Sequence, residues 1–164
     1  MALTATQIAQ LNRAMKANQN ASVGTLLALL DNVPNAASLG AMNKVSQAVT
    51  YDEFTDGGGA VGTLDLDDAI PAGASFLLGN LLAVVGFAGD VSAALTVGDG
   101  TDVDRYNAST IDVFSAIAGG VGLGEPSGTI YHAAEKTVTL TITVDADWGS
   151  VTAGGFTIEL FYLT

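Results

Sequence analysis

Three aspartates lie within six residues of one glycine-rich turn and form the densest group of candidate metal ligands in the sequence. Asp99, Asp102 and Asp104 could supply carboxylate oxygens to a hard cation such as calcium. Their spacing matches neither the twelve-residue EF-hand loop nor the nonapeptide repeat, and Asp-Gly is also an ordinary hairpin-turn sequence. Arg105 follows directly, so a salt bridge to Asp102, to Asp104 or to an acid of a neighbouring chain is the alternative to a bound cation.

No pattern of side chains in the sequence encodes a catalytic site. Asp67 with Asp68, and Asp145 with Asp147, are acid pairs of the type that glycosidases use, but sequence spacing does not set the carboxyl separation that such enzymes need. His132 is the single histidine, no G-x-S-x-G motif accompanies it, and the chain contains no cysteine. We therefore predict a protein that is not an enzyme and needs no cofactor.

Acidic residues are unevenly distributed along the chain. The 164 residues contain 17 Asp and Glu against 5 Lys and Arg, which gives a net charge of −12. Residues 1–50 carry a net +2, whereas residues 51–164 carry −14. The acidic part would repel phosphate, which argues against nucleic acid as a partner. The longest apolar stretch, residues 76–88, is too short to span a bilayer, so we expect no membrane association and synthesis in the cytoplasm.

Two segments of the first fifty residues have helical spacing. Residues 4–17 begin with a capping-box pattern, place Ile8, Leu11 and Met15 on one face, and predict a short amphipathic helix. Residues 38–49 also suit a helix, although Gly40 weakens it, and an extended arm packed against a neighbour is the alternative. The amino-terminal part is therefore predicted to be a short helical arm.

After residue 49 the spacing changes to strand-like alternation, with glycine-rich turns between the runs. Residues 137–144 place aliphatic side chains on one face and threonines on the other, which predicts a strand with one solvated face. Residues 91–97 alternate in the same way. Residues 76–85, and the distal end of residues 156–163, are apolar in both registers, so something is expected to cover their second face.

This pattern predicts a mainly β chain that folds as an antiparallel β-sandwich, jelly-roll-like, with the short N-terminal helical arm. We divide the chain into residues 1–48, the helix and arm, and residues 49–164, the β-sandwich domain. Residues 118–128 contain five glycines and are predicted to be a surface loop.

Four stretches of the chain resemble small structural proteins of tailed bacteriophages. They are IPAGA at residues 70–74, LTVGDGTD at 95–102 with Asp104-Arg105-Tyr106, the strand at 137–144, and TAGGFTI at 152–158. Over residues 60–164 the chain is similar in particular to β-sandwich head decoration, or cement, proteins. The resemblance implies a virion protein on the outer capsid surface that forms a homo-oligomer, with a trimer favoured, and clamps neighbouring subunits of the major capsid protein.

The charge asymmetry indicates the amino-terminal segment, and the double apolar face of the last strand indicates its distal end, as the parts that would make those contacts. The candidate capsid or inter-subunit contacts are Ile8, Leu11, Arg13, Met15, Lys16, Lys44, Phe161 and Leu163. The competing hypothesis is a phage tail, fibre or spike module that binds a receptor or glycan through Trp148 and the loop at residues 118–128. Taken by itself, Trp148 is interpreted as a lid over one end of the sandwich, and an exposed anchor for a partner or a sugar is the alternative.

Overall fold

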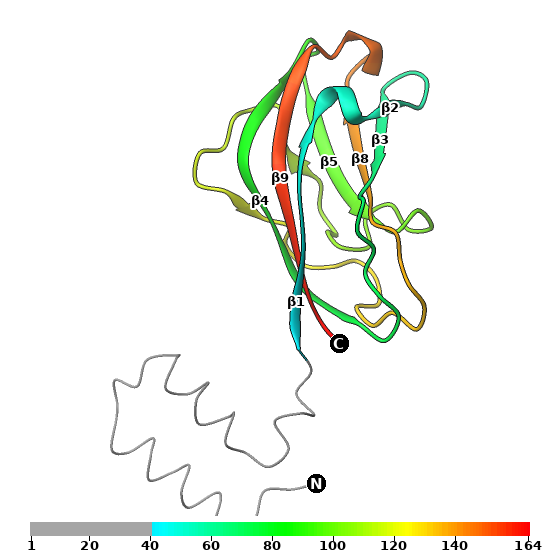
Figure 1. The fold of residues 1–164 in the computed structure, drawn as a ribbon. Coiled ribbons are helices and arrows are strands. Elements are labelled where there is room, and N and C mark those ends of the chain that lie inside the picture. Colours follow the sequence, from blue (N-terminus) through cyan, green and yellow to red (C-terminus); the bar gives the residue numbers. More distant parts are fainter. Residues whose placement is uncertain (1–40) are drawn as a thin grey trace, which may run out of the picture. The chain divides into compact units, whose positions relative to one another are not determined.

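A computed structural model describes residues 41–164, so the helix predicted for residues 4–17 lies outside the described residues. The described part is almost entirely β-structure (Figure 1). None of its helices is long and apolar enough to cross a membrane. The strands are β1 (Met42–Thr50), β2 (Thr55–Asp56), β3 (Val61–Asp65), β4 (Ser75–Ala88), β5 (Ala93–Gly98), β6 (Ile111–Asp112), β7 (Val121–Gly122), β8 (Thr139–Val144) and β9 (Ala153–Leu163), and the short 3-10 helices are η2 (Tyr51–Glu53) and η3 (Trp148–Ser150).

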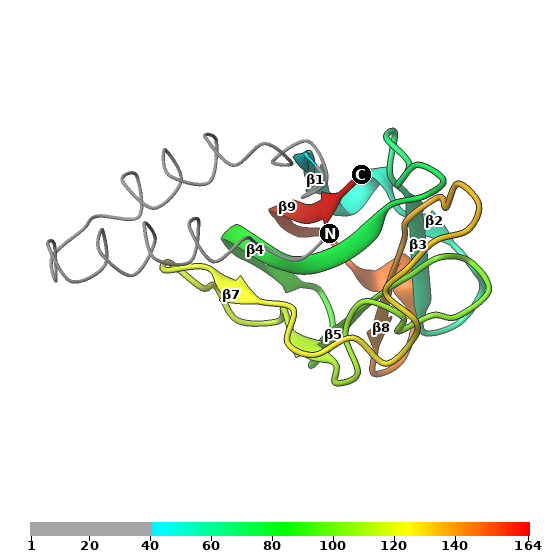
Figure 2. The same ribbon diagram turned by 90° about the horizontal axis from the view of Figure 1, so that it is seen from below.

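The strands form two antiparallel sheets, which confirms the prediction of a mainly β antiparallel fold. One sheet has four strands in the order β1-β9-β4-β7, and the other has five in the order β2-β3-β8-β5-β6. Figure 2 shows the two sheets as separate layers. The pairing is nested: β1 pairs with β9, β3 with β8, β4 with β7 and β5 with β6. Strands from the two ends of the described chain therefore pair first, and the pairs that follow lie progressively closer in sequence.

A single hydrophobic core joins the buried faces of the two sheets. In β8 the aliphatic residues predicted to share one face, Leu140, Ile142 and Val144, are all buried, and the threonines between them point outward. This strand begins at Thr139, two residues later than the alternation predicted. The period-two pattern therefore identified the face on which the core lies.

The chain from Met42 to Thr50 is a strand, so the helix considered for residues 38–49 is wrong over this part. β1 pairs with β9 in continuous register over nine residues. Val45 and Val49 are both buried, and a separation of four residues puts two side chains on one face of a strand as well as of a helix. Pairing with β9 decides between them, and the boundary drawn after residue 48 falls inside this strand.

The glycine-rich stretch at residues 118–128 is more than a surface loop. It contains β7, which pairs with Asn80 and Leu81 of β4, and Leu123 is buried in the core. Gly79 makes room for this contact, because a Cβ there would lie 2.4 Å from the Leu123 side chain.

Candidate interaction surface

The outer face of the four-stranded sheet carries a run of apolar side chains that we call the apolar strip. The strand registers bring its members side by side on adjacent strands. Leu78 pairs with Phe161, which in turn pairs with Lys44, and Met42 pairs with Leu163. The strip consists of Met42, Leu78, Leu82, Val85, Phe161 and Leu163.

Most of the apolar strip is open to solvent. Met42 is 69% exposed, Val85 61%, Leu78 48% and Leu82 37%. A group of large exposed apolar side chains on one face is typical of a surface that another macromolecule covers. The prediction that β4 has two apolar faces therefore holds, and residues 41–164 cover only one of them.

Irregular pairing shapes the part of the strip that lies on β4. The register with β9 shifts between Leu82 and Val85, and Ala83 between them has φ of 51°, in the left-handed region. Such a bulge adds a residue to one strand and lets Leu82 and Val85 both face outward, three positions apart.

The charged side chains at the strand positions of this face are Lys44 and Glu159. Their ion pair has an Nζ–Oε1 distance of 2.5 Å, and the Lys44 ammonium lies 6.0 Å from the centre of the Phe161 ring. Lys44, Phe161 and Leu163, three of the predicted contact residues, are thus neighbours on one face. The other five, Ile8, Leu11, Arg13, Met15 and Lys16, lie outside the described residues.

The outer face of the five-stranded sheet has a different composition. Thr55, Thr63, Thr141 and Thr96 form one row across four strands. In the adjacent row the hydroxyl of Thr139 donates to Asp65. Hydroxyl groups remain well solvated on an exposed sheet, so this face requires no covering partner.

The predicted aspartate cluster at residues 99–104 forms an internal salt-bridge network. One Asp99 oxygen lies 2.8 Å from both Nε of Arg105 and Nζ of Lys136, and the Asp99 side chain is inaccessible to solvent. The other oxygen accepts the backbone N–H groups of Thr101 and Asp102. Residues 41–164 contain no group of three acidic or histidine side chains arranged to hold a metal ion.

Asp99 rather than Asp102 or Asp104 is therefore the partner of Arg105, and the pair lies within one chain. Gly98 permits the tight turn, since a Cβ there would lie 2.0 Å from the Asp102 carbonyl oxygen. Asp104 instead accepts a hydrogen bond from the hydroxyl of Ser127. The network joins the loop after β5 to the segment before β8.

The charges around Asp99 determine its ionisation. Burial alone would raise the pKa of this carboxyl, but the ammonium of Lys136, the backbone N–H groups of Asp102 and Thr101 and the charge of Arg105 outweigh it. Together they lower the pKa of Asp99 from 3.8 to about 2. Asp99 is a carboxylate at all ordinary pH values.

His132 lies beside this network and is buried, 1% exposed. Its Nε2 is 3.3 Å from the hydroxyl of Tyr106, and no hydrogen-bond partner for Nδ1 is found in the described part of the chain. Burial lowers the pKa of His132, Arg105 and Lys136 lower it further, and Asp99 opposes them. The ring is neutral at pH 7 and belongs to the core, not to a surface site.

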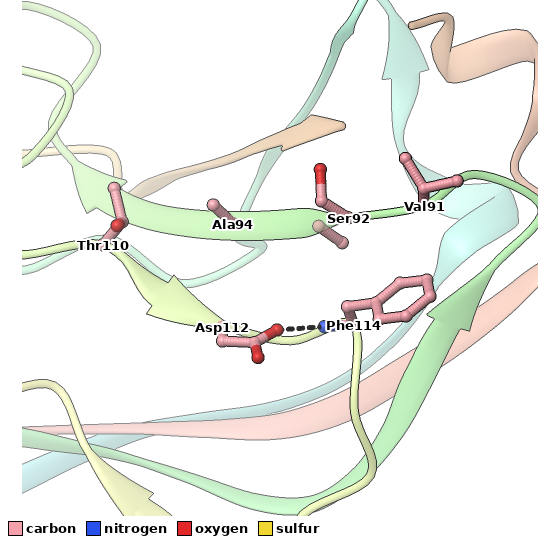
Figure 3. Close-up of a pocket in the computed structure, with 7 residues that line it drawn as sticks. Val91, Ser92, Ala94, Thr110, Asp112 and Phe114 are labelled. Atoms are coloured by element: carbon pink, nitrogen blue, oxygen red, sulfur yellow. Dashed lines mark hydrogen bonds between the residues drawn. The ribbon is translucent and has the colours of Figure 1, made fainter. Parts of the chain in front are cut away.

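A shallow hollow of about 310 Å³ lies between β5 and β6 (Figure 3). Val91 and Phe114 contribute apolar surface to it, and Asp112 accepts the backbone N–H of Phe114 at 2.9 Å. Asp112 is the one charged residue among those that line it, and one of its oxygens is already engaged by this hydrogen bond, so we assign no ligand to the hollow. The acid pairs considered for catalysis, Asp67 with Asp68 and Asp145 with Asp147, are exposed.

Trp148 covers one end of the core. It is 5% exposed and packs on Phe54 and Phe87, with ring centres 5.3 and 6.2 Å away. Gly62 lies beneath it, because a Cβ there would lie 2.4 Å from the indole. A side chain held in this way is a lid and is not available to bind a glycan.

Sequence reasoning missed Lys136 as a partner of Asp99, and it missed the exposure of Leu78, Leu82 and Val85. The exposed side chains could have been found from residues 76–85, which are apolar on both faces. That pattern indicated a covered second face but did not show which residues form it. The first has no local signal, because Asp99 and Lys136 are 37 positions apart and meet only through the fold.

No family model matches the chain, and no curated protein matches it. Among solved structures, the chain is similar to a chain of the capsid asymmetric unit of cyanophage Pam1. The TM-score is 0.54 at 16% sequence identity, and the match covers 76% of this chain and 85% of that one. At such low identity the likeness establishes a shared fold, extending over most of both chains.

Proposed function

We propose that this chain is a structural protein of a tailed bacteriophage virion, and within it a head decoration, or cement, protein. It would bind the outer surface of the capsid, associate with the major capsid protein and with its own copies, with a trimer favoured, and stabilise the shell. The observation that carries the proposal is the fold similarity to a chain of a phage capsid asymmetric unit. This role requires no catalysis.

The strand arrangement supports a jelly-roll sandwich as the framework. Apart from the short β2, the eight strands pair first with last and inward from there, in two sheets of order β1-β9-β4-β7 and β3-β8-β5-β6. Nested pairing of this kind is what a ribbon of strands gives when it wraps into a double-sheet jelly roll. The apolar strip supplies the exposed surface that an assembling protein needs.

The copy number in purified virions tests the proposal. Quantitative mass spectrometry should find hundreds of copies, in a fixed ratio to the major capsid protein. A handful of copies would instead support the tail, fibre or spike alternative, and absence from the virion would refute both.

A second experiment addresses the amino-terminal segment, which we propose as the contact to the shell because of its net positive charge. The deletion has to end at residue 40, since one that ends at 48 removes most of β1 and opens the four-stranded sheet. The protein lacking residues 1–40 should remain folded by circular dichroism and lose binding to empty capsids. Undiminished binding would contradict this role.

A further inference from the structure

We propose that the apolar strip binds a second copy of this chain. The inference deepens the proposed function, in which copies associate, by assigning their contact to the outer face of the four-stranded sheet. It rests on three observations: the exposure of the strip, its charge, and the composition of the opposite face.

The exposure of the apolar strip is the first observation that favours a partner on this face. Leu78, Leu82 and Val85 project from β4, a strand that is hydrogen-bonded on both sides, so they lie on a sheet surface rather than at a ragged edge. Met42, Phe161 and Leu163 extend the surface across β9 and β1. Removing such side chains from water is favourable in proportion to the apolar area covered.

Charge indicates which partner it is. Residues 41–164 contain three cationic and sixteen acidic side chains, a net charge of −13. A basic partner would be attracted to the acidic surfaces, whereas a partner with the same negative charge is repelled there. On the face of the strip Lys44 and Glu159 neutralise each other, so this is where another acidic molecule approaches with least repulsion. A second copy is such a molecule.

The opposite face supports the same assignment by contrast. Its rows of threonine are broken by Asp65 and Asp112, which are unbalanced by any cation at the strand positions of that face. Two copies meeting there would bury hydroxyl groups and bring like charges together, which is unfavourable. Self-association through the strip leaves this threonine face in solvent.

Sedimentation velocity of the full chain tests the inference. The wild type should self-associate at concentrations up to about 100 μM. Association should strengthen as salt rises from about 50 to about 500 mM, because salt screens the repulsion between the acidic copies and leaves the apolar contact intact. A basic partner bound by charge attraction would show the opposite salt dependence.

Variants locate the contact. Leu78→Asp, and independently Val85→Asp, should weaken self-association at least about tenfold, because each places an unpaired carboxylate in the contact. Thr143→Asp, the matched change on the threonine face, should leave it unchanged. Circular dichroism and thermal melts show whether each variant is folded, and two strip positions are used so that one misfolded variant does not decide the outcome.

Three results would overturn the inference: a monomeric wild type throughout that concentration range, folded strip variants that associate like the wild type, or equal disruption by Thr143→Asp. None of them bears on virion copy number, so the proposed place in the virion would survive them, although a monomeric wild type would remove self-association in solution from the proposed function. Conversely, a self-associating protein that is absent from virions would overturn the proposed function alone.

Discussion

The described part of the chain has three cationic side chains, and it uses them in two very different places. Arg105 and Lys136 both pair with Asp99, whose side chain is inaccessible to solvent. Lys44 pairs with Glu159 on the apolar strip, where the Lys44 side chain is 42% exposed. In the first region two cations pair with a single buried carboxylate, and in the second one cation pairs with one carboxylate on a surface.

The difference shows two separate uses of charge in an acidic protein. Around Asp99, the salt bridges to Arg105 and Lys136 hold together loops that lie outside the regular strands. Burial strengthens this attraction. On the strip, the pair adds little to folding because solvent screens it, yet it removes net charge from a face surrounded by acids. The first region therefore serves the fold, and the second is suited to assembly.

Among the variants that test this difference between the two regions, Asp99→Asn should have the largest effect. The amide can still accept the N–H groups of Thr101 and Asp102, but Arg105 and Lys136 lose their counter-charge. Both are partly exposed and can turn to water, so we expect a loss of about 2 kcal/mol in the free energy of unfolding at pH 7, the equivalent of the lowered pKa.

The pH dependence of stability gives the sign of this contribution. The pKa of Asp99 is 3.8 unfolded and about 2 folded, so its contribution is complete above about pH 4 and disappears as the pH falls toward 2. Urea unfolding across this range should show a larger loss in the wild type than in Asp99→Asn, where the loss that remains includes that of Asp90, whose pKa is lowered chiefly by the backbone N–H groups of Ala146 and Val91. Asp68→Asn, at an exposed site, is the matched control; an equal effect there would mean that overall charge, not the network, is responsible.

A smaller effect is expected at His132, on the core side of the same network. Its folded pKa lies below the usual 6.5, so the unfolded chain takes up the proton first and stability falls as the pH drops through 6.5. The chain has one histidine, so this step is assigned to it directly. His132→Gln, which keeps a polar group near Tyr106, should remove the fall in stability that begins as the pH drops below 6.5 in urea unfolding.

Asp99 provides an internal check on that step. It is the acid that opposes the lowering of the His132 pKa, so Asp99→Asn should make the loss of stability below pH 6.5 larger. A step that persists in His132→Gln, or one that shrinks in Asp99→Asn, would show that another group titrates there.

The sequence revealed the strands far better than it revealed these two regions. Alternation in residues 137–144 identified both a strand and its buried face, because period two is a local property. The strand at Met42–Thr50 was ambiguous, since Val45 and Val49 satisfy helix and strand spacing alike and only pairing with β9 separates them. Lys136 as the partner of Asp99 was not visible at all, because that contact depends on how two distant loops fold together.

For the candidate surface, the local sequence indicated that such a surface exists but not how its residues are arranged. The double apolar faces of residues 76–85 and 156–163 indicated that something covers a second face, and Lys44, Phe161 and Leu163 were chosen separately from charge and hydropathy. That these three are neighbours follows from the pairing register between β1 and β9, in which a shift of one residue would turn the side chains to the other face.

The smallest expected effect concerns the surface pair, and it tests whether neutrality of the strip matters. Lys44→Gln and Glu159→Gln should each change the free energy of unfolding by only about 0–1 kcal/mol, because an exposed pair contributes little. Lys44→Gln leaves Glu159 as an unbalanced charge on the strip and should weaken self-association about threefold by adding repulsion. The double variant restores neutrality without the ion pair, so it should associate like the wild type. If the double variant is as weak as Lys44→Gln, the lysine acts through a direct contact with the partner rather than by neutralising the face.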